Sequence, residues 1–169
     1  MGHIFTVRMI LLLITTVSCG LLIPEIESVS ERRPGLRYLP ELIFAVYAAA
    51  YVYLTLLSRS EIDVSYATGV ELRPLSALRR AMLRGSVLPI RGIILNILLF
   101  IPMGYLLPLI FRKLRKHTVT DVVLICLLIS LATETLQLIF QVGWFDADDI
   151  INNTVGALIG AAIWRVRSR

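Results

Sequence analysis

The sequence predicts an all-α, polytopic integral membrane protein with four to five transmembrane helices and one interfacial amphipathic helix. Of its 169 residues, 57% are hydrophobic and only 17% are charged, and the mean hydropathy is +0.79. A soluble domain carries about 45–50% apolar and about 25% charged residues. Apolar stretches near the roughly 20 residues that cross a bilayer recur along the chain. Basic residues gather at the ends of these stretches, where contacts with lipid headgroups explain them better than nucleic-acid binding does.

Five apolar stretches are candidate spans. They run over residues 4–23, 42–57, 93–111, 122–142 and 150–164. The third and fourth are long enough as they stand, and the second and fifth reach span length with their flanking residues. The extra length of the fifth stretch comes from Asp146 to Asp149, so this span begins with acidic residues.

The first stretch has two interpretations. Arg8, the apolar run after it and Ser18-Cys19-Gly20 resemble a cleaved signal or lipoprotein peptide. Thr16 stands three residues before the cysteine, where an aliphatic residue is usual, so we predict a retained helix. This divides the chain into residues 1–40, a transmembrane helix with a cytoplasmic loop, and residues 41–169, a membrane domain.

Short basic loops predict the orientation in the cell membrane. Residues 112–116 hold four lysines and arginines, and the tail after the fifth span holds three more arginines. The loop over residues 143–149 holds no basic residue and three aspartates. We therefore predict a multi-pass protein with a cytoplasmic C-terminus and the acidic loop outside.

Residues 74–85 predict a surface helix with an apolar side and a basic side. The apolar side is expected to hold Leu75, Leu78 and Met82, with Arg79, Arg80 and Arg84 away from it. A basic side of this kind suits phosphates of lipids or of lipid-linked sugars. A loop helix with a solvated basic side fits the same pattern.

Polar residues interrupt the last three spans. Glu134, Gln137 and Gln141 share one helical face in the fourth span. Glu134 lies about 12 Å from the end of that span, at 1.5 Å per residue. A charge at a helix centre costs roughly 2.5–3.5 kcal/mol on insertion scales. These residues therefore indicate a functional site within the membrane.

The fifth and third spans supply further candidates. Gly156 and Gly160 predict close packing of the fifth span on the fourth, which would let Asn153 bridge to Glu134 or Gln137. The predicted ligand-binding residues are Asn96, Glu134, Gln137, Asp146, Asp149 and Asn153. Simpler roles stay open for each residue, since the aspartates suit helix caps and the amides suit interhelical hydrogen bonds.

Three spaced segments resemble the VanZ-like family: NILLFIPMGYLLP from Asn96, ETLQ from Glu134 and DADDIINNTVGALIG from Asp146. The resemblance spans about residues 57–164, so residues 41–169 are identified as a VanZ-like membrane domain. The matching positions are Asn96, Pro102, Gly104, Glu134, Gln137, Asp146, Asp149, Asn153 and Gly156. Where the family commonly has an arginine before the acidic run, this chain has Gly143-Trp144. If that arginine pairs with the acids or contacts the ligand, the ligand of this chain is expected to differ.

The resemblance implies a cell-envelope protein, because the family's namesake lowers susceptibility to the lipoglycopeptide teicoplanin. The first hypothesis is a non-enzymatic pocket that binds an amphipathic molecule, such as a lipoglycopeptide, a lipid-linked wall precursor or a membrane lipid. The alternatives are an enzyme acting on a lipid-linked precursor, with Asp146 and Asp149 holding Mg²⁺, and a small proton-coupled transporter using Glu134. The sequence holds no nucleophile motif, which favours the first hypothesis. It predicts no cofactor and no nucleic-acid partner, and it leaves the metal and the oligomeric state open.

Overall fold

The computed structural model describes residues 38–57, 69–85, 87–111 and 118–168. The first candidate span, the cytoplasmic loop after it and the basic loop at residues 112–116 lie outside the described residues. The elements, in chain order, are α2 (Leu39–Val52), η2 (Tyr53–Leu57), β1 (Val70–Glu71), α4 (Ser76–Arg84), α5 (Leu88–Ile110), α6 (Val119–Ile139), β2 (Phe145–Asp146) and α7 (Ala147–Arg167). The predominantly helical fold that the sequence predicts is confirmed. The structure also contains a two-stranded parallel sheet, which was not predicted from the sequence.

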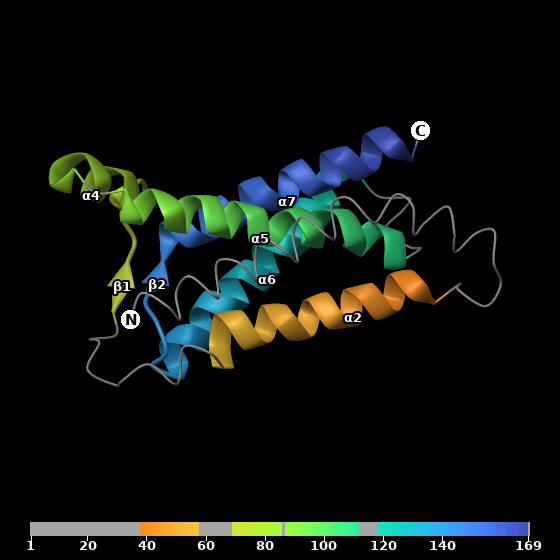
Figure 1. Ribbon diagram of the computed structural model, residues 1–169, viewed down its shortest axis with the longest axis horizontal. Helices are drawn as coiled ribbons and strands as arrows, with labels where there is room; N and C mark the ends of the chain where they lie inside the picture. Colours follow the sequence, from red (N-terminus) through yellow and green to blue (C-terminus); the bar gives the residue numbers. More distant parts are fainter. Residues whose placement is uncertain (1–37, 58–68, 86, 112–117, 169) are drawn as a thin grey trace.

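Four long helical elements form a bundle (Figure 1). The helices α5 and α7 run in one direction, and α6 and α2 with η2 run in the other. The strands β1 and β2 and the helix α4 lie together at the end where α5 and α7 begin. We call this the strand end of the bundle.

Three helices in the described residues are long and apolar enough to cross a membrane: Leu39–Leu57, Pro89–Ile110 and Val119–Ile139. Their outward side chains are apolar and exposed, with Leu128 64% exposed near the middle of α6. Such an apolar surface is unfavourable in water and is typical of a helix that faces the hydrocarbon core of a membrane. The helix α7 is as long as α6 but carries two aspartates in its first turn and two arginines in its last. A fourth span formed by α7 stays a prediction.

The closest packing in the bundle joins α5 to α7. A Cβ atom added at Gly156 or Gly160 would collide with the carbonyl oxygen of Ile97 or Ile101, and one at Gly104 would collide with that of Ala157. Small residues let two helix backbones approach in this way. The prediction that Gly156 and Gly160 pack on the fourth span was wrong, because their neighbour is α5. Gly104 completes the contact from the α5 side, and α5 remains helical through Pro102.

The amphipathic segment forms α4, but its faces differ from the prediction. Ala77 and Ala81 are buried against the rest of the protein, while Leu75 and Met82 are exposed. Arg79 is exposed on the same side as these two apolar residues. Small alanines allow the closer contact, so Leu75 and Met82 point outward while Leu78 is half-buried. The prediction that Arg79 lies away from the apolar side was wrong.

Candidate functional site

The strand pair carries the acidic loop to the segment that precedes α4. Val70 pairs with Phe145 and Glu71 with Asp146 in parallel register, and Phe145 N donates to Gly69 O at 3.0 Å. The indole of Trp144 packs against Gly69, where any Cβ would touch the ring. These contacts bring residues more than seventy positions apart to one place at the strand end.

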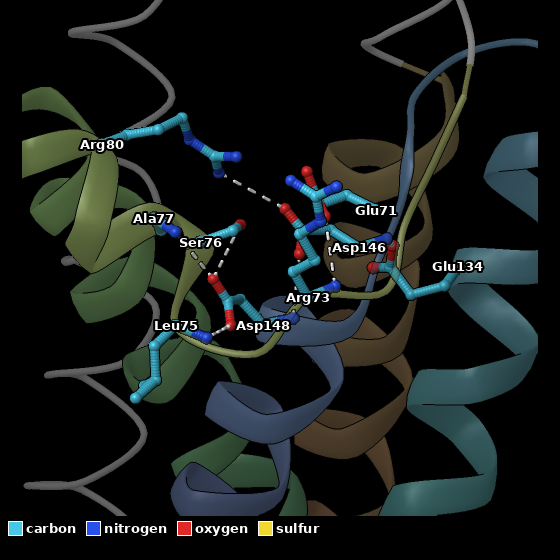
Figure 2. A network of polar contacts seen from close by, with 9 residues as sticks. All are labelled: Glu71, Arg73, Leu75, Ser76, Ala77, Arg80, Glu134, Asp146 and Asp148. Atoms are coloured by element: carbon cyan, nitrogen blue, oxygen red, sulfur yellow. Dashed lines mark hydrogen bonds and ion pairs between the residues drawn. The ribbon is translucent and has the colours of Figure 1, made fainter.

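Asp148 is the most heavily used carboxylate of this cluster. It accepts hydrogen bonds from Leu75 N at 2.5 Å, Ala77 N at 2.8 Å and Ser76 Oγ at 3.1 Å. The first turn of a helix leaves N–H groups that its own hydrogen bonds do not satisfy. Leu75 precedes α4 and offers no capping side chain. Asp148, from the first turn of α7, therefore caps α4 from another helix (Figure 2).

Asp146 joins three parts of the cluster. Its side chain accepts from Asp148 N at 2.9 Å as the N-cap of α7, and it lies 3.7 Å from a guanidinium nitrogen of Arg80. Its backbone N–H donates to Glu134 Oε2 at 3.1 Å. The capping role that the sequence left open for Asp146 is present, and it coexists with contacts to α4 and α6.

Glu134 and Gln137 lie on the buried side of α6, each only 2% exposed. The amide of Gln137 donates to Thr55 O in η2 at 3.2 Å. Gln141 lies apart from both, because α6 ends at Ile139 and Gln141 is exposed with φ of 57°. The predicted polar face therefore holds two of its three members.

A second pair of polar contacts continues the buried side of α6 towards the middle of the bundle. Asn153 Nδ2 donates to Ser130 Oγ at 2.8 Å, and the hydroxyls of Tyr51 and Thr133 lie 2.6 Å apart. The predicted bridge from Asn153 to Glu134 or Gln137 is absent, since the amide meets Ser130 about one turn deeper. Asn153 Oδ1 is buried and has no hydrogen-bond partner among the described residues. The linked polar residues Asp146, Glu134, Gln137, Thr133, Ser130 and Asn153, with their partners, are called the polar seam below.

The other predicted site residues lie less centrally. Asp149 is half-buried in the first turn of α7, beside Asp148, and Asn96 is half-buried on α5 next to Ile97, which contacts Gly156. Figure 2 draws neither residue. No sequence pattern identified Asp148, Glu71, Ser130 or Thr133 as site residues. The run of acidic residues indicated that an aspartate mattered there, but not which one faced α4.

Carboxylates outnumber guanidinium groups within the polar network drawn at the strand end in Figure 2. Four carboxylates, from Glu71, Glu134, Asp146 and Asp148, stand with two guanidinium groups, from Arg73 and Arg80 (Figure 2). When all are ionised, these six groups have a formal excess of two negative charges, and Asp149, Arg79 and Arg91 lie at the same end of the bundle. Among the described residues, no three His, Cys, Asp or Glu side chains are grouped so as to hold a metal ion. The arrangement suits an organic cation in contact with carboxylates.

Burial raises the pKa of the Asp146 carboxyl above its usual range. The Asp148 N–H opposes this shift, the Asp148 carboxylate adds to it, Arg80 opposes it and Glu71 adds to it. The folded protein therefore takes up this proton more readily than the unfolded chain does. The contribution of Asp146 to stability then grows as the pH falls through its raised folded pKa and is complete below its unfolded pKa.

This shift predicts how the Asp146→Asn variant behaves. Asparagine keeps an oxygen acceptor for Asp148 N but does not titrate. We expect the wild type to gain unfolding free energy relative to the variant as the pH falls from about 7 to about 4. Denaturant titration of both proteins in detergent at several pH values measures this difference. A difference that does not change with pH would contradict the prediction.

The chain is similar to known proteins of one family. A family profile described as VanZ/LLP1 matches residues 44–168. Protein VanZ of Enterococcus faecium is 34% identical to the chain over 79 residues, which cover 47% of this chain and 47% of that protein. The alignment thus spans about half the length of the curated relative. No solved structure matches the chain. Because the family profile covers most of the sequence, including every residue of the polar seam, the chain belongs to the VanZ/LLP1 family.

Proposed function

We propose that this membrane protein binds an amphipathic molecule of the cell envelope, whose cationic group enters the strand end, and thereby lowers susceptibility to teicoplanin-type lipoglycopeptides. The observation that carries the proposal is the network of four carboxylates and two guanidinium groups in Figure 2, at one end of an apolar bundle. An ammonium group would gain charge-assisted hydrogen bonds there. The similarity to Protein VanZ supports the resistance part of the proposal.

The surroundings of the strand end suit the apolar part of such a molecule. Leu72 and Trp144 are exposed beside the carboxylates, at 65% and 49%. Tryptophan is enriched where proteins meet the membrane surface, because its ring is both apolar and polar. A ligand with an acyl chain and an amine would place the chain in lipid and the amine between Asp146 and Glu134, whose carboxylate accepts from Asp146 N. The unpartnered Asn153 Oδ1 offers an acceptor deeper in the polar seam.

The orientation and span count belong to the same proposal. The arginines in the last turn of α7 lie at the opposite end of the bundle from the acidic residues. The segment between η2 and α5 also carries arginines, but long segments count less in the positive-inside rule. The short basic loops then favour a strand end outside and a C-terminus in the cytoplasm. With α7 as a span, the site faces the compartment in which wall precursors and lipoglycopeptides meet.

Glu134→Gln tests the binding site. Glutamine keeps an oxygen that accepts from Asp146 N but removes the negative charge. Loss of a hydrogen bond to a charged group costs about 1.5–3 kcal/mol, so affinity for a long-chain alkylamine should fall about ten- to a hundredfold. Isothermal titration of the purified protein in nanodiscs measures this change. The control is Glu41→Gln, which removes an exposed carboxylate at the opposite end of the bundle and should leave affinity unchanged.

Susceptibility of cells tests the biological part. A Gram-positive host without its own homologue would express the wild type, Glu134→Gln or Glu41→Gln at matched membrane levels. We expect protection against teicoplanin and none against vancomycin, which lacks the acyl chain. Protection should be lost with Glu134→Gln and kept with Glu41→Gln. Equal protection by both variants would refute a role for the carboxylates, and no protection by the wild type would refute the resistance role.

A further inference from the structure

The helix α4 presents a face that no other part of the described chain covers. Leu75 is 62% exposed, and Met82 and Leu83 are each 75% exposed. Arg79 is also exposed, and its helical position lies between those of Met82 and Leu83, with Leu75 directly before the first turn. We call these four residues the outer face of α4. Three large apolar side chains around one arginine are unusual on a surface that meets only water.

The opposite side of α4 packs against the bundle and is fixed there by several polar contacts. Ser76, Ala77 and Ala81 are buried, and Asp148 caps the first turn through three hydrogen bonds. Arg80 reaches Asp146 on the same side. Contacts at both the start and the middle of so short a helix fix its rotation about its own axis. The outer face is therefore directed away from the bundle as a consequence of the fold.

The position of α4 matches the level of a membrane surface. It lies at the strand end, where the membrane-length helix α5 begins and α6 ends (Figure 1). Helices that lie in the headgroup layer bury their apolar face about 5–10 Å into the boundary with the acyl chains. A long arginine side chain in such a face lays its methylene groups along apolar surface and keeps its guanidinium among the headgroups.

We propose that the outer face of α4 lies in the headgroup layer and that Arg79 binds the phosphate of an anionic phospholipid. The charges around Arg79 favour this partner. The sequence of α4, SALRRAMLR, holds no acidic residue, and the neighbouring carboxylates of Asp146 and Asp148 face Arg80 and the start of the helix instead. A guanidinium forms paired hydrogen bonds with phosphate oxygens. This inference does not depend on the ligand proposed for the strand end.

A second copy of the chain is the competing occupant, and Arg79 disfavours it. In a two-fold dimer the same patch meets itself. Two copies of a face with Arg79 near its centre would bring like charges together in an apolar contact, which is unfavourable. A lipid phosphate supplies the opposite charge, and the acyl chains cover Leu75, Met82 and Leu83.

The first experiment measures lipid binding. Native mass spectrometry of the purified full chain would compare phosphatidylglycerol with phosphatidylcholine. One basic residue near a lipid surface contributes about 1 kcal/mol, so Arg79→Gln should lower the preference for phosphatidylglycerol about fivefold. The control Arg167→Gln removes an exposed arginine from the other end of the bundle. An equal loss in both variants, or no loss with Arg79→Gln, would overturn the assignment of the phosphate to Arg79.

The second experiment locates the outer face. Met82→Cys would carry an environment-sensitive fluorophore in a chain whose Cys19 and Cys126 are replaced by alanine, reconstituted in vesicles that contain phosphatidylglycerol. We expect strong quenching by nitroxide-labelled lipids and weak quenching by iodide. Strong iodide quenching would place the face in water and overturn the proposal. Weak quenching by both agents, together with a doubled molecular mass, would show a dimer contact and would also overturn it.

Discussion

Replacing Gly156 with alanine is expected to lower the unfolding free energy by about 1–3 kcal/mol, the range for overpacking a close contact. The added methyl group would collide with the carbonyl oxygen of Ile97 and with Phe100. A backbone carbonyl in the middle of α5 cannot rotate away without breaking its helical hydrogen bond. The helices would therefore separate, and the loss would extend to the neighbouring contact of Gly160 with Ile101.

The matched control for this prediction is Gly92→Ala. Gly92 also lies within a long helix, and an added Cβ there meets nothing within 4 Å. Alanine favours a helix over glycine by about 1 kcal/mol, so this variant should be neutral or more stable. Unfolding of both variants in mixed detergent micelles, followed by circular dichroism, gives the comparison. Equal stability of the two variants would show that α5 and α7 are not packed backbone to backbone.

Asp148→Ala has the second large effect, and we expect it to be local. Each buried N–H or hydroxyl group left without a partner costs about 1–3 kcal/mol. The variant removes the acceptor for Leu75 N, Ala77 N and Ser76 Oγ together. Because α4 is short and its own sequence offers no cap, it should fray and leave the bundle while the long helices persist. Hydrogen exchange read by mass spectrometry should rise strongly over residues 70–84.

Asp121→Ala is the control for this variant. Asp121 forms a capping box with Thr118 at the start of α6, at the other end of the bundle. Its loss should raise exchange in the first turn of α6 and leave residues 70–84 protected. If Asp148→Ala left α4 as protected as in the wild type, the cap from α7 would not be what holds this helix.

The helices could be predicted because hydropathy and length act locally. The burial of Glu134 and Gln137 was also predictable in part, since two polar residues three positions apart in an apolar helix share a side. The end of α6 was not, because the chain turns at Gln141 into the segment that pairs with β1. That pairing depends on residues about seventy positions upstream, which no local pattern contains.

The sequence did not determine which helix the glycines contact or which aspartate faces α4. Gly156 and Gly160 indicate that a backbone comes close, but glycine carries no side chain that would distinguish α5 from α6. The contacts of the three aspartates in residues 146–149 were equally undetermined. Asp146, Asp148 and Asp149 are chemically alike, and the residue that faces α4 is decided by the position at which α7 begins, after β2. The π-helix η2, whose Thr55 O accepts from Gln137, was likewise not predicted from the local sequence.

The cap that Asp148 provides for α4 has a consequence for the order in which the protein is made. A chain emerges from the ribosome from its N-terminus, so α4 is complete about sixty residues before α7 begins. During that interval the first turn of α4 lacks its acceptor, β1 lacks its partner strand, and Arg80 lacks Asp146. The long helices can insert in sequence, but the strand end closes only when the last helix arrives. The helix α7 therefore completes the candidate binding site, and through Asp148 it supplies the cap that α4 lacks until then.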